Sequence, residues 1–430
     1  MAAAVLAAVL LVASGAAPAS AQDSTPSPSP TAPALSGTVD TTLAPVGNGV
    51  VHPGDPLDVW VSLTNGTAYS VGETAVTLAV GGQALTARSA LSAWLAGKGQ
   101  AAGMTTIGSA RLDAVASGAT AARLVIVPAD DPAISSRSPG VYPLRAVFSG
   151  PSGTRTATSV MIVPDPSTPV SPVGVIVPIT AGPLTSGLLT SEQLAAMTAP
   201  DGELTAALDA VDGTDAILAV DPAIPAAIRV LGTAAPPRAT AWLDRLLTLT
   251  NSRFALQFAD ADPVAQLASG QTTLLAPTSL QAYMKAEDFP PETNNGSTPA
   301  PSGTAPASPT PTPTATTVPG QPVYPDLGTL LGIGAGARDA VYWPFAGTAD
   351  AAAVGKLGRL PSGDTESVTL VSSAATAGGA GDGAAPAGGK AGAAHVLVYD
   401  QDASAAVTTA AEDGADQTRG APLTAATAYL

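Results

Sequence analysis

Residues 173–180 read Val-Gly-Val-Ile-Val-Pro-Ile-Thr, a nearly continuous apolar run. Comparable runs recur along the rest of the chain, at 216–220, 254–258, 272–276, 340–343, 368–371 and 395–399. Such runs are typical of parallel strands that are buried on both faces. Amphipathic stretches of helical length lie between them, at 191–197, 204–211, 226–231, 238–249 and 349–360. Seven βα-type units predict an α/β domain over 172–430, with a parallel sheet that is either open or closed into an incomplete (β/α) barrel.

The chain before residue 165 follows a different pattern, in which apolar and polar residues alternate. Residues 57–63 read Leu-Asp-Val-Trp-Val-Ser-Leu, and similar stretches lie at 74–80, 121–127, 141–148 and 156–163. Period-two alternation between Gly, Pro and Asn turns predicts an immunoglobulin-like β-sandwich over 37–165. Leu91, Trp94 and Leu95 have helical spacing, so we expect a helix at 89–96 that packs over one open end of the sandwich.

Several segments are too biased in composition to form a core. Residues 2–13 contain only Ala, Val and Leu, and Ala19-Ser20-Ala21 follows them, which predicts a signal peptide at 1–21 and an exported protein. The alternative is an uncleaved membrane anchor, for which the run is too short. A Pro/Ser/Thr-rich tether is predicted at 22–36, and disordered insertions at about 290–322 and 374–394. Residues 423–430 begin a helix that no strand follows, so either the barrel is incomplete or the chain is a shortened form of a longer protein.

Composition excludes several classes of function. The net charge of −16 opposes binding to nucleic acid or anionic lipid. The chain contains no Cys and only two His, so we expect no metal site, no cofactor and no catalytic Ser-His pair. The glycine-rich run 331–337 follows a predicted helix and precedes a predicted strand, the reverse of a dinucleotide-binding loop, and is interpreted as a helix C-cap.

Candidate site residues follow the predicted strands, because ligands of parallel α/β domains bind at the carboxyl ends of the strands. The candidate catalytic residues are Asp260, Asp400, Asp221 and Asp262, and the candidate ligand-binding residues are Trp343 and Ser279. Two carboxylates beside an aromatic ring are what a glycoside hydrolase needs: an acid, a base or nucleophile, and a platform for the sugar.

A structural interpretation of the same residues stays open. Asp221 and Asp262 each precede a proline, which is the pattern of a helix N-cap followed by Pro at the first helical position. Trp343 precedes Pro344 and could simply pack at the rim of the domain.

The second domain also carries motifs of a known family. These motifs lie at 175–180, 187–194, 219–224, 241–246, 258–263, 275–279 and 342–344. They resemble a family of exported actinobacterial proteins known only as a domain of unknown function. Members often continue into a further domain and a C-terminal membrane helix, and their genes tend to lie near that of a lipid II flippase. The resemblance implies the cell envelope, a shortened chain here, and no assigned reaction.

Two functions remain. The first is an exported, non-catalytic binding or scaffold protein of the cell envelope, linked to cell-wall biogenesis, whose partner is an envelope protein or a wall glycan. The second is a carbohydrate-active hydrolase that uses an aspartate pair at the strand ends. We favour the first, because no Glu follows any predicted strand and capping explains several of the aspartates.

Overall fold

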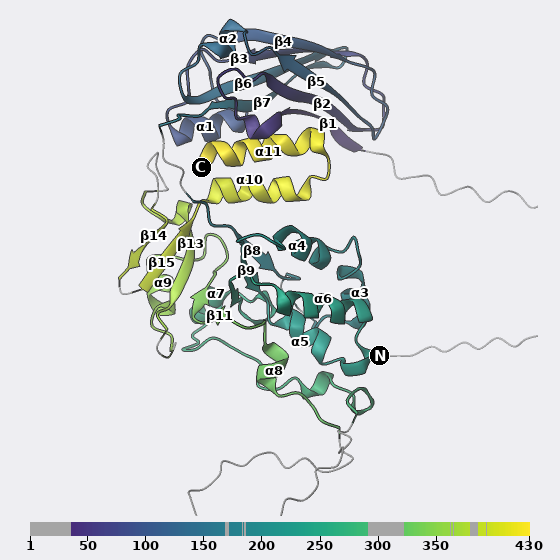
Figure 1. Cartoon of the computed structure of the whole chain (residues 1–430), viewed down its shortest axis with the longest axis vertical. Helices are drawn as coiled ribbons and strands as arrows, with labels where there is room; N and C mark the ends of the chain where they lie inside the picture. The colour runs from purple at the N-terminus through teal and green to yellow at the C-terminus, as the bar shows by residue number, and fades with distance from the viewer. Residues whose placement is uncertain are drawn as a thin grey trace, which may run out of the picture.

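The computed structural model describes residues 36–167, 172–182, 184, 186–290, 322–361, 363, 365–378, 386–392 and 394–430. The predicted signal peptide, nearly all of the predicted tether and residues 291–321 of the first insertion lie outside the described residues. The described chain forms a β-sandwich, an α/β region, and a pair of C-terminal helices that lie between them (Figure 1).

Two antiparallel sheets form the sandwich. The first sheet contains three strands in the order β1 (Ser36–Pro45), β2 (Leu57–Thr67) and β5 (Thr120–Val127). The second contains four, in the order β4 (Thr105–Leu112), β3 (Thr74–Val80), β6 (Gly140–Gly150) and β7 (Gly153–Val163). The predicted immunoglobulin-like sandwich is therefore confirmed as two packed antiparallel sheets.

The alternation of apolar and polar residues along the strands places the apolar side chains in the core of the sandwich. Val59 and Val61 of β2 face Leu78 of β3 and Leu144 and Phe148 of β6, and all five side chains are buried. Each such side chain stabilises the fold by roughly 1.5–3 kcal/mol relative to an exposed one. The sequence pattern did not predict β1 and β4, because β1 is rich in Thr and small residues and half of the β4 residues are exposed.

Helix α1 (Arg88–Leu95) lies where a helix was predicted, but it packs on a sheet face. Leu91 and Trp94 are buried against Val160, which points outward from β7. The Trp94 indole donates a hydrogen bond to the carbonyl oxygen of Ser159 at 2.7 Å. This contact fixes α1 to the outer side of β7.

The α/β region begins with a parallel sheet whose strand order follows the sequence: β8 (Ile176–Ile179), β9 (Ile217–Val220), β10 (Arg253–Ala255) and β11 (Ala337–Arg338). The parallel sheet predicted from the apolar runs is therefore confirmed. The helices of this part are α3 (Ser191–Met197), α4 (Glu203–Val211), α5 (Ala223–Arg229), α6 (Pro237–Thr248), α7 (Pro263–Ala268) and α8 (Leu327–Leu331).

A second sheet continues the fold. Strands β12 (Val341–Tyr342), β13 (Val368–Ser372) and β15 (Ala394–Tyr399) are parallel, and helix α9 (Ala351–Leu357) accompanies them. The two sheets are joined by the short turn between β11 and β12, where Ala340 adopts a φ of 56°. Apolar residues of both sheets, among them Ala219, Phe254 and Leu370, share one cluster.

Two predicted segments differ from the structure. Residues 272–276 form no strand, because β11 from beyond the 290–322 insertion pairs with β10 and occupies the place beside it. Part of the predicted disordered insertion at 374–394 is ordered: β14 (Gly388–Ala391) pairs antiparallel with β15 at the edge of the second sheet.

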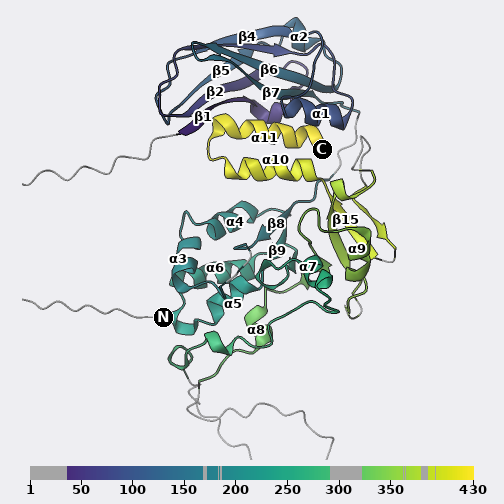
Figure 2. The ribbon, with the colours of Figure 1, turned by 180° about the vertical axis from the view of Figure 1, so that it is seen from behind.

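The C-terminal helices α10 (Gln401–Glu412) and α11 (Asp416–Tyr429) form a hairpin that reaches back to the sandwich, as both ribbon views show (Figures 1 and 2). The prediction placed residues 172–430 in one domain, whereas α11 packs against β1, β7 and the 3₁₀ turn at Val46–Gly49. A Cβ atom at Gly420 would lie 2.7 Å from the carbonyl oxygen of Pro45, so glycine permits this close approach.

Among the described residues, no helix combines the length and the apolar character needed to cross a bilayer.

Candidate functional site

Asp221 follows β9 and is fully buried. One of its carboxylate oxygens, Oδ1, accepts hydrogen bonds from the backbone N–H of Ala223 at 2.8 Å and of Ala259 at 3.0 Å. The other oxygen, Oδ2, has no hydrogen-bond partner among the described residues. Burial raises the pKa of Asp221 to about 6, and the nearby charge of Asp260 adds to this rise, whereas interactions with the backbone N–H groups of Ala223, Ala259 and Asp260 oppose it.

Asp260 lies in a strained turn after β10. Ala259 and Asp260 have φ values of 59° and 52°, a left-handed conformation that costs a residue with a Cβ atom about 1–2 kcal/mol. The N–H that Ala259 donates to Asp221 helps to hold this turn. Burial raises the pKa of the Asp260 carboxyl, and a hydrogen bond with Thr180, which follows β8, opposes the rise. Asp221, Asp260 and Thr180 are therefore brought together at adjacent strand ends.

Asp262 is the N-cap of α7. Its Oδ1 accepts hydrogen bonds from the N–H of Val264 at 3.1 Å and of Phe345 at 3.4 Å. The second bond links the start of α7 to the segment that follows β12. Asp262 therefore has a structural role in addition to the catalytic one that the sequence left open.

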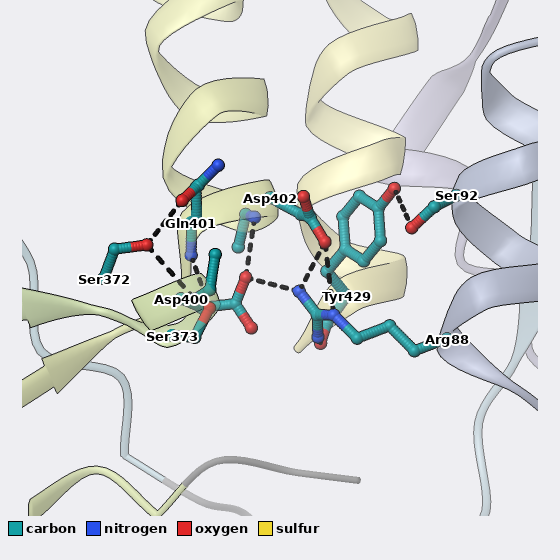
Figure 3. Close-up of polar contacts among 10 residues, drawn as sticks. Arg88, Ser92, Ser372, Ser373, Asp400, Gln401, Asp402 and Tyr429 are labelled. Atoms are coloured by element: carbon teal, nitrogen blue, oxygen red, sulfur yellow. Dashed lines mark hydrogen bonds and ion pairs between the residues drawn. The ribbon is translucent and has the colours of Figure 1, made fainter. Parts of the chain in front are cut away.

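Asp400 follows β15 but lies at the junction with the sandwich (Figure 3). Its Oδ1 caps α10 by accepting from the N–H of Ala403 at 2.9 Å, and it receives Nη2 of Arg88 at 2.6 Å. Arg88 comes from α1 of the sandwich, 312 residues earlier in the chain. The structure thus pairs Asp400 with a cation of the other domain, and among the described residues no hydrogen bond joins it to Asp221, Asp260 or Asp262.

Arg88 is the centre of this junction. Its guanidinium also contacts Asp402 of α10, with Nη2 at 3.1 Å and Nε at 3.2 Å from Oδ2, and it donates to the carbonyl oxygen of Tyr429 at 3.3 Å. It lies 4.7 Å from the centre of the Tyr429 ring, whose hydroxyl hydrogen-bonds to Ser92 at 3.1 Å. Burial lowers the pKa of Arg88, but hydrogen bonding and the charges of the two aspartates outweigh it, so that the pKa is raised. We call Arg88, Asp400, Asp402 and Tyr429 the junction cluster.

The start of α10 is tied to the second sheet as well. Gln401 and Ser372, the last residue of β13, form a side-chain hydrogen bond of 2.5 Å. The backbone N–H of Gln401 donates to the Ser373 hydroxyl at 3.2 Å. Helix α10 therefore connects the α/β region to the sandwich through contacts on both sides (Figure 3).

The two candidate ligand-binding residues lie in different surroundings. Trp343 is half-buried, packs edge-on against Tyr399 with ring centres 6.1 Å apart, and lines a cavity of about 580 Å³. Ser279 is exposed, and its hydroxyl accepts from the N–H of Gln281 at 3.2 Å at the start of a short 3₁₀ turn.

Two arginines, the buried Arg253 and the half-buried Arg229, have roles that the sequence analysis missed. Arg253 of β10 donates to the carbonyl oxygens of Leu246 at 2.8 Å and Ile333 at 3.0 Å, and Arg229 of α5 donates to those of Leu330 at 2.9 Å and Gly332 at 2.6 Å. Burial lowers the pKa of both guanidiniums. Both arginines satisfy carbonyls at helix ends, which agrees with interpreting the glycine-rich run as a C-cap region.

The chemistry available at the strand ends is therefore limited. Asp221 and Asp260 form a pair of carboxyl groups with raised pKa, but Asp221 has no exposed surface. The described residues contain no group of three or more His, Cys, Asp or Glu that could hold a metal ion. Arg88, which no motif singled out, has one signal in the sequence: it is the first Lys or Arg of the whole chain.

The fold is that of a multidomain protein, in which a β-sandwich is joined to a parallel α/β region. Strand-end aspartates cap helices, and a cation lies at the domain junction. A family model described as a family of unknown function (DUF6049) matches residues 1–428. The chain belongs to this family.

Solved structures show only distant likeness. The CARDB domain of the PF1109 protein from Pyrococcus furiosus is 14% identical, with 29% of this chain and 88% of that chain covered and a TM-score of 0.18. The sporulation control protein Spo0M from Bacillus subtilis is 11% identical, with 30% of this chain and 50% of that chain covered and a TM-score of 0.21. A search of the curated proteins finds no significant match. These likenesses assign no function.

Proposed function

We propose that this protein is an exported, non-catalytic binding or scaffold protein of the cell envelope. The observation that carries the proposal is the use of the strand-end aspartates as structural groups. Asp262 and Asp400 cap helices, Asp400 also pairs with Arg88, and Asp221 is buried with two backbone donors. Carboxylates that are engaged in this way hold elements of the fold in place and are poorly placed to transfer protons to a substrate.

The proposed location in the cell envelope is argued from the sequence. The apolar run and the Ala-Ser-Ala site at 1–21 support export through a signal peptide. The motifs that resemble exported actinobacterial proteins, whose genes tend to lie near that of a lipid II flippase, support an actinobacterial origin and a role linked to cell-wall biogenesis. The partner in this proposal is an envelope protein or a wall glycan.

We also infer that the two parallel sheets are the parts of an incomplete, barrel-like wall. The strand order along β8 to β13 follows the sequence, and the apolar cluster around Ala219, Phe254 and Leu370 receives side chains from both sheets. This arrangement supports a curved sheet in place of two independent ones.

A carbohydrate-active hydrolase remains a second candidate because of one observation. Asp221 and Asp260 lie at neighbouring strand ends, the charge of Asp260 raises the pKa of Asp221, and Asp260 has a raised pKa of its own. Paired carboxyl groups with raised pKa values are a feature of glycoside hydrolases. The full burial of Asp221 is the argument against this candidate.

Release of reducing sugar separates the two candidates. The wild-type chain and Asp260→Asn are incubated with purified cell-wall glycan, and reducing ends are measured over time. We expect the same background rate for both, together with retention of envelope partners in a pull-down with the wild-type chain. A wild-type rate well above background that is lost in Asp260→Asn would establish the hydrolase instead.

A further inference from the structure

The cavity of about 580 Å³ arises where the two parallel sheets separate. Pairing between β10 and β11 ends at Phe254 and Arg338, the chain bends at Ala340, and pairing resumes between β12 and β13. The cavity is lined by residues 255–257, 331–334 and 337–343, together with Pro263, Gly328 and Pro361. The cavity therefore reaches the carboxyl end of β10, and α/β folds commonly bind ligands at the carboxyl ends of their strands.

Aromatic side chains form part of the wall. Tyr342 and Trp343 are consecutive and half-buried, and both line the cavity. Trp343 is held edge-on against Tyr399 and packs with Leu370, so that its ring has a fixed position before any ligand arrives. A preformed aromatic wall lowers the entropic cost of binding.

The polar groups of the cavity are balanced in charge. Within the described part of the chain, the charged residues of the lining are Arg338 and Asp339, which are adjacent, exposed and opposite in sign. One guanidinium nitrogen of Arg338 donates to the carbonyl oxygen of Glu366 at 3.0 Å, which restrains the side chain. A lining with one cation and one anion gives no net attraction for a phosphate or for a polyanion.

We propose that this cavity binds an uncharged oligosaccharide. A sugar ring presents an apolar face of C–H groups, which packs on an indole or phenol ring, and hydroxyls that both donate and accept hydrogen bonds. Asp339 accepts from such hydroxyls, and the free nitrogens of Arg338 donate to them. The inference rests on the proposed binding function and adds the class of ligand and the place where it binds.

The test is isothermal titration calorimetry of the full chain with two neutral oligosaccharides, chitotetraose and cellotetraose. We expect at least one of them to bind to the wild-type chain with a measurable Kd. Trp343→Ala should weaken that binding tenfold or more, whereas Trp343→Phe, which keeps an aromatic ring in the same apolar cluster, should retain most of it.

Asp339→Ala is a second variant of the cavity lining, which tests the proposal even if Trp343→Ala does not fold. Asp339 is exposed, so we expect this variant to keep the wild-type melting temperature and to bind several-fold more weakly. Tyr69→Ala is the matched control, because Tyr69 is an aromatic residue with 82% exposure on the sandwich, and it should bind as the wild type does.

Two results would overturn the proposal: no binding of either oligosaccharide at millimolar concentration, or equal affinity in the wild type, Asp339→Ala and Trp343→Ala. Either result would leave the proposed scaffold function standing if envelope partners are still retained in the pull-down. Loss of those partners with intact oligosaccharide binding would support the proposed ligand of the cavity and contradict the proposed scaffold function.

Discussion

At the scale of single residues, Asp221 is the least expected feature of the protein. An ionised carboxylate without exposed surface is costly, and one oxygen of Asp221 has no partner among the described residues. The other oxygen accepts from Ala223 and Ala259 and thereby joins the start of α5 to the strained turn after β10. We infer that this carboxyl is kept for its two backbone hydrogen bonds, at a cost in stability at neutral pH.

The Asp221→Asn variant tests this cost. Asn keeps an oxygen that can accept both bonds and carries no charge. The pKa of Asp221 is about 6 in the folded protein and about 4 in an unfolded chain, so the folded state holds the proton more tightly. The resulting stabilisation is fully present below about pH 4 and is lost as the pH rises through 6.

We therefore expect the wild type to lose stability relative to Asp221→Asn between pH 4 and pH 7, by on the order of 2–3 kcal/mol. Urea unfolding at pH 4, 5, 6 and 7 measures this difference. A free-energy difference that stays constant over this range would contradict the assignment.

Among the elements, the C-terminal hairpin connects the two parts of the fold, because it contacts both the sandwich and the second sheet. Helix α11 approaches β1 so closely that the backbone at Gly420 faces the carbonyl of Pro45, and the side chain of Thr424 lies against Gly49. The junction cluster joins α1 to the first turn of α10 and the end of α11 (Figure 3).

Gly420→Ala tests the close approach of α11. Alanine favours a helix by about 1 kcal/mol over glycine, yet its Cβ atom would lie 2.7 Å from the oxygen of Pro45. We expect a net destabilisation of roughly 1–3 kcal/mol in thermal or urea unfolding.

Gly355→Ala in α9 is the matched control for this substitution. The Cβ atom there would meet only the end of the Arg359 side chain, at 3.6 Å, so alanine should stabilise the protein. Equal stabilisation by the two substitutions would show that α11 does not pack tightly on β1.

Arg88→Met tests the junction cluster. Methionine keeps most of the length of the side chain but leaves Asp400 and Asp402 without their cation, for which we expect a loss of about 1–3 kcal/mol. Amide hydrogen exchange in α11 should become faster at the same time.

Arg111→Met serves as the control for the loss of an arginine. Its partner Glu73 lies 3.5 Å away and both side chains are largely exposed, so the change should cost less than about 0.5 kcal/mol. If exchange in α11 were unchanged in Arg88→Met, the cluster would not hold the hairpin.

At the scale of the whole molecule, the sandwich is completed by residues from the far end of the chain. The outward-facing cluster of Leu91, Trp94 and Val160 receives Ala428 and Tyr429 from α11. One outer face of the sandwich is therefore covered by a hairpin that follows the entire α/β region in sequence.

Deletion of residues 416–430 tests this dependence. Removal of α11 should expose part of the cluster around Val160 and lower the melting temperature of the sandwich by about 5 °C or more. Intrinsic fluorescence reports the transition, since Trp94 lies in this cluster. An unchanged sandwich transition would mean that α11 covers this face without stabilising it.

The local pattern of apolar and polar residues predicted many strands and helices, but it did not predict the contacts of the candidate site residues. Three predicted strands agree with observed ones to within one residue at their ends: 57–63 with part of β2, 216–220 with β9 and 368–371 with β13. They could be predicted because the burial of one or both faces of a strand determines its local pattern of apolar and polar residues. Residues 272–276, Thr-Thr-Leu-Leu-Ala, also contain a short apolar run but form no strand, since pairing beside β10 is decided by which distant segment arrives there.

The hydrophobic period of each segment predicts the class of each element and the division between an alternating β part and a parallel α/β part, because that period is a local property. The roles of the strand-end aspartates emerge only in the assembled fold. Asp221 became a buried acceptor for two segments, and Asp400 became the partner of Arg88, 312 residues away. A carboxylate takes its role from the donors and charges around it, and those neighbours come from parts of the chain that no local pattern relates.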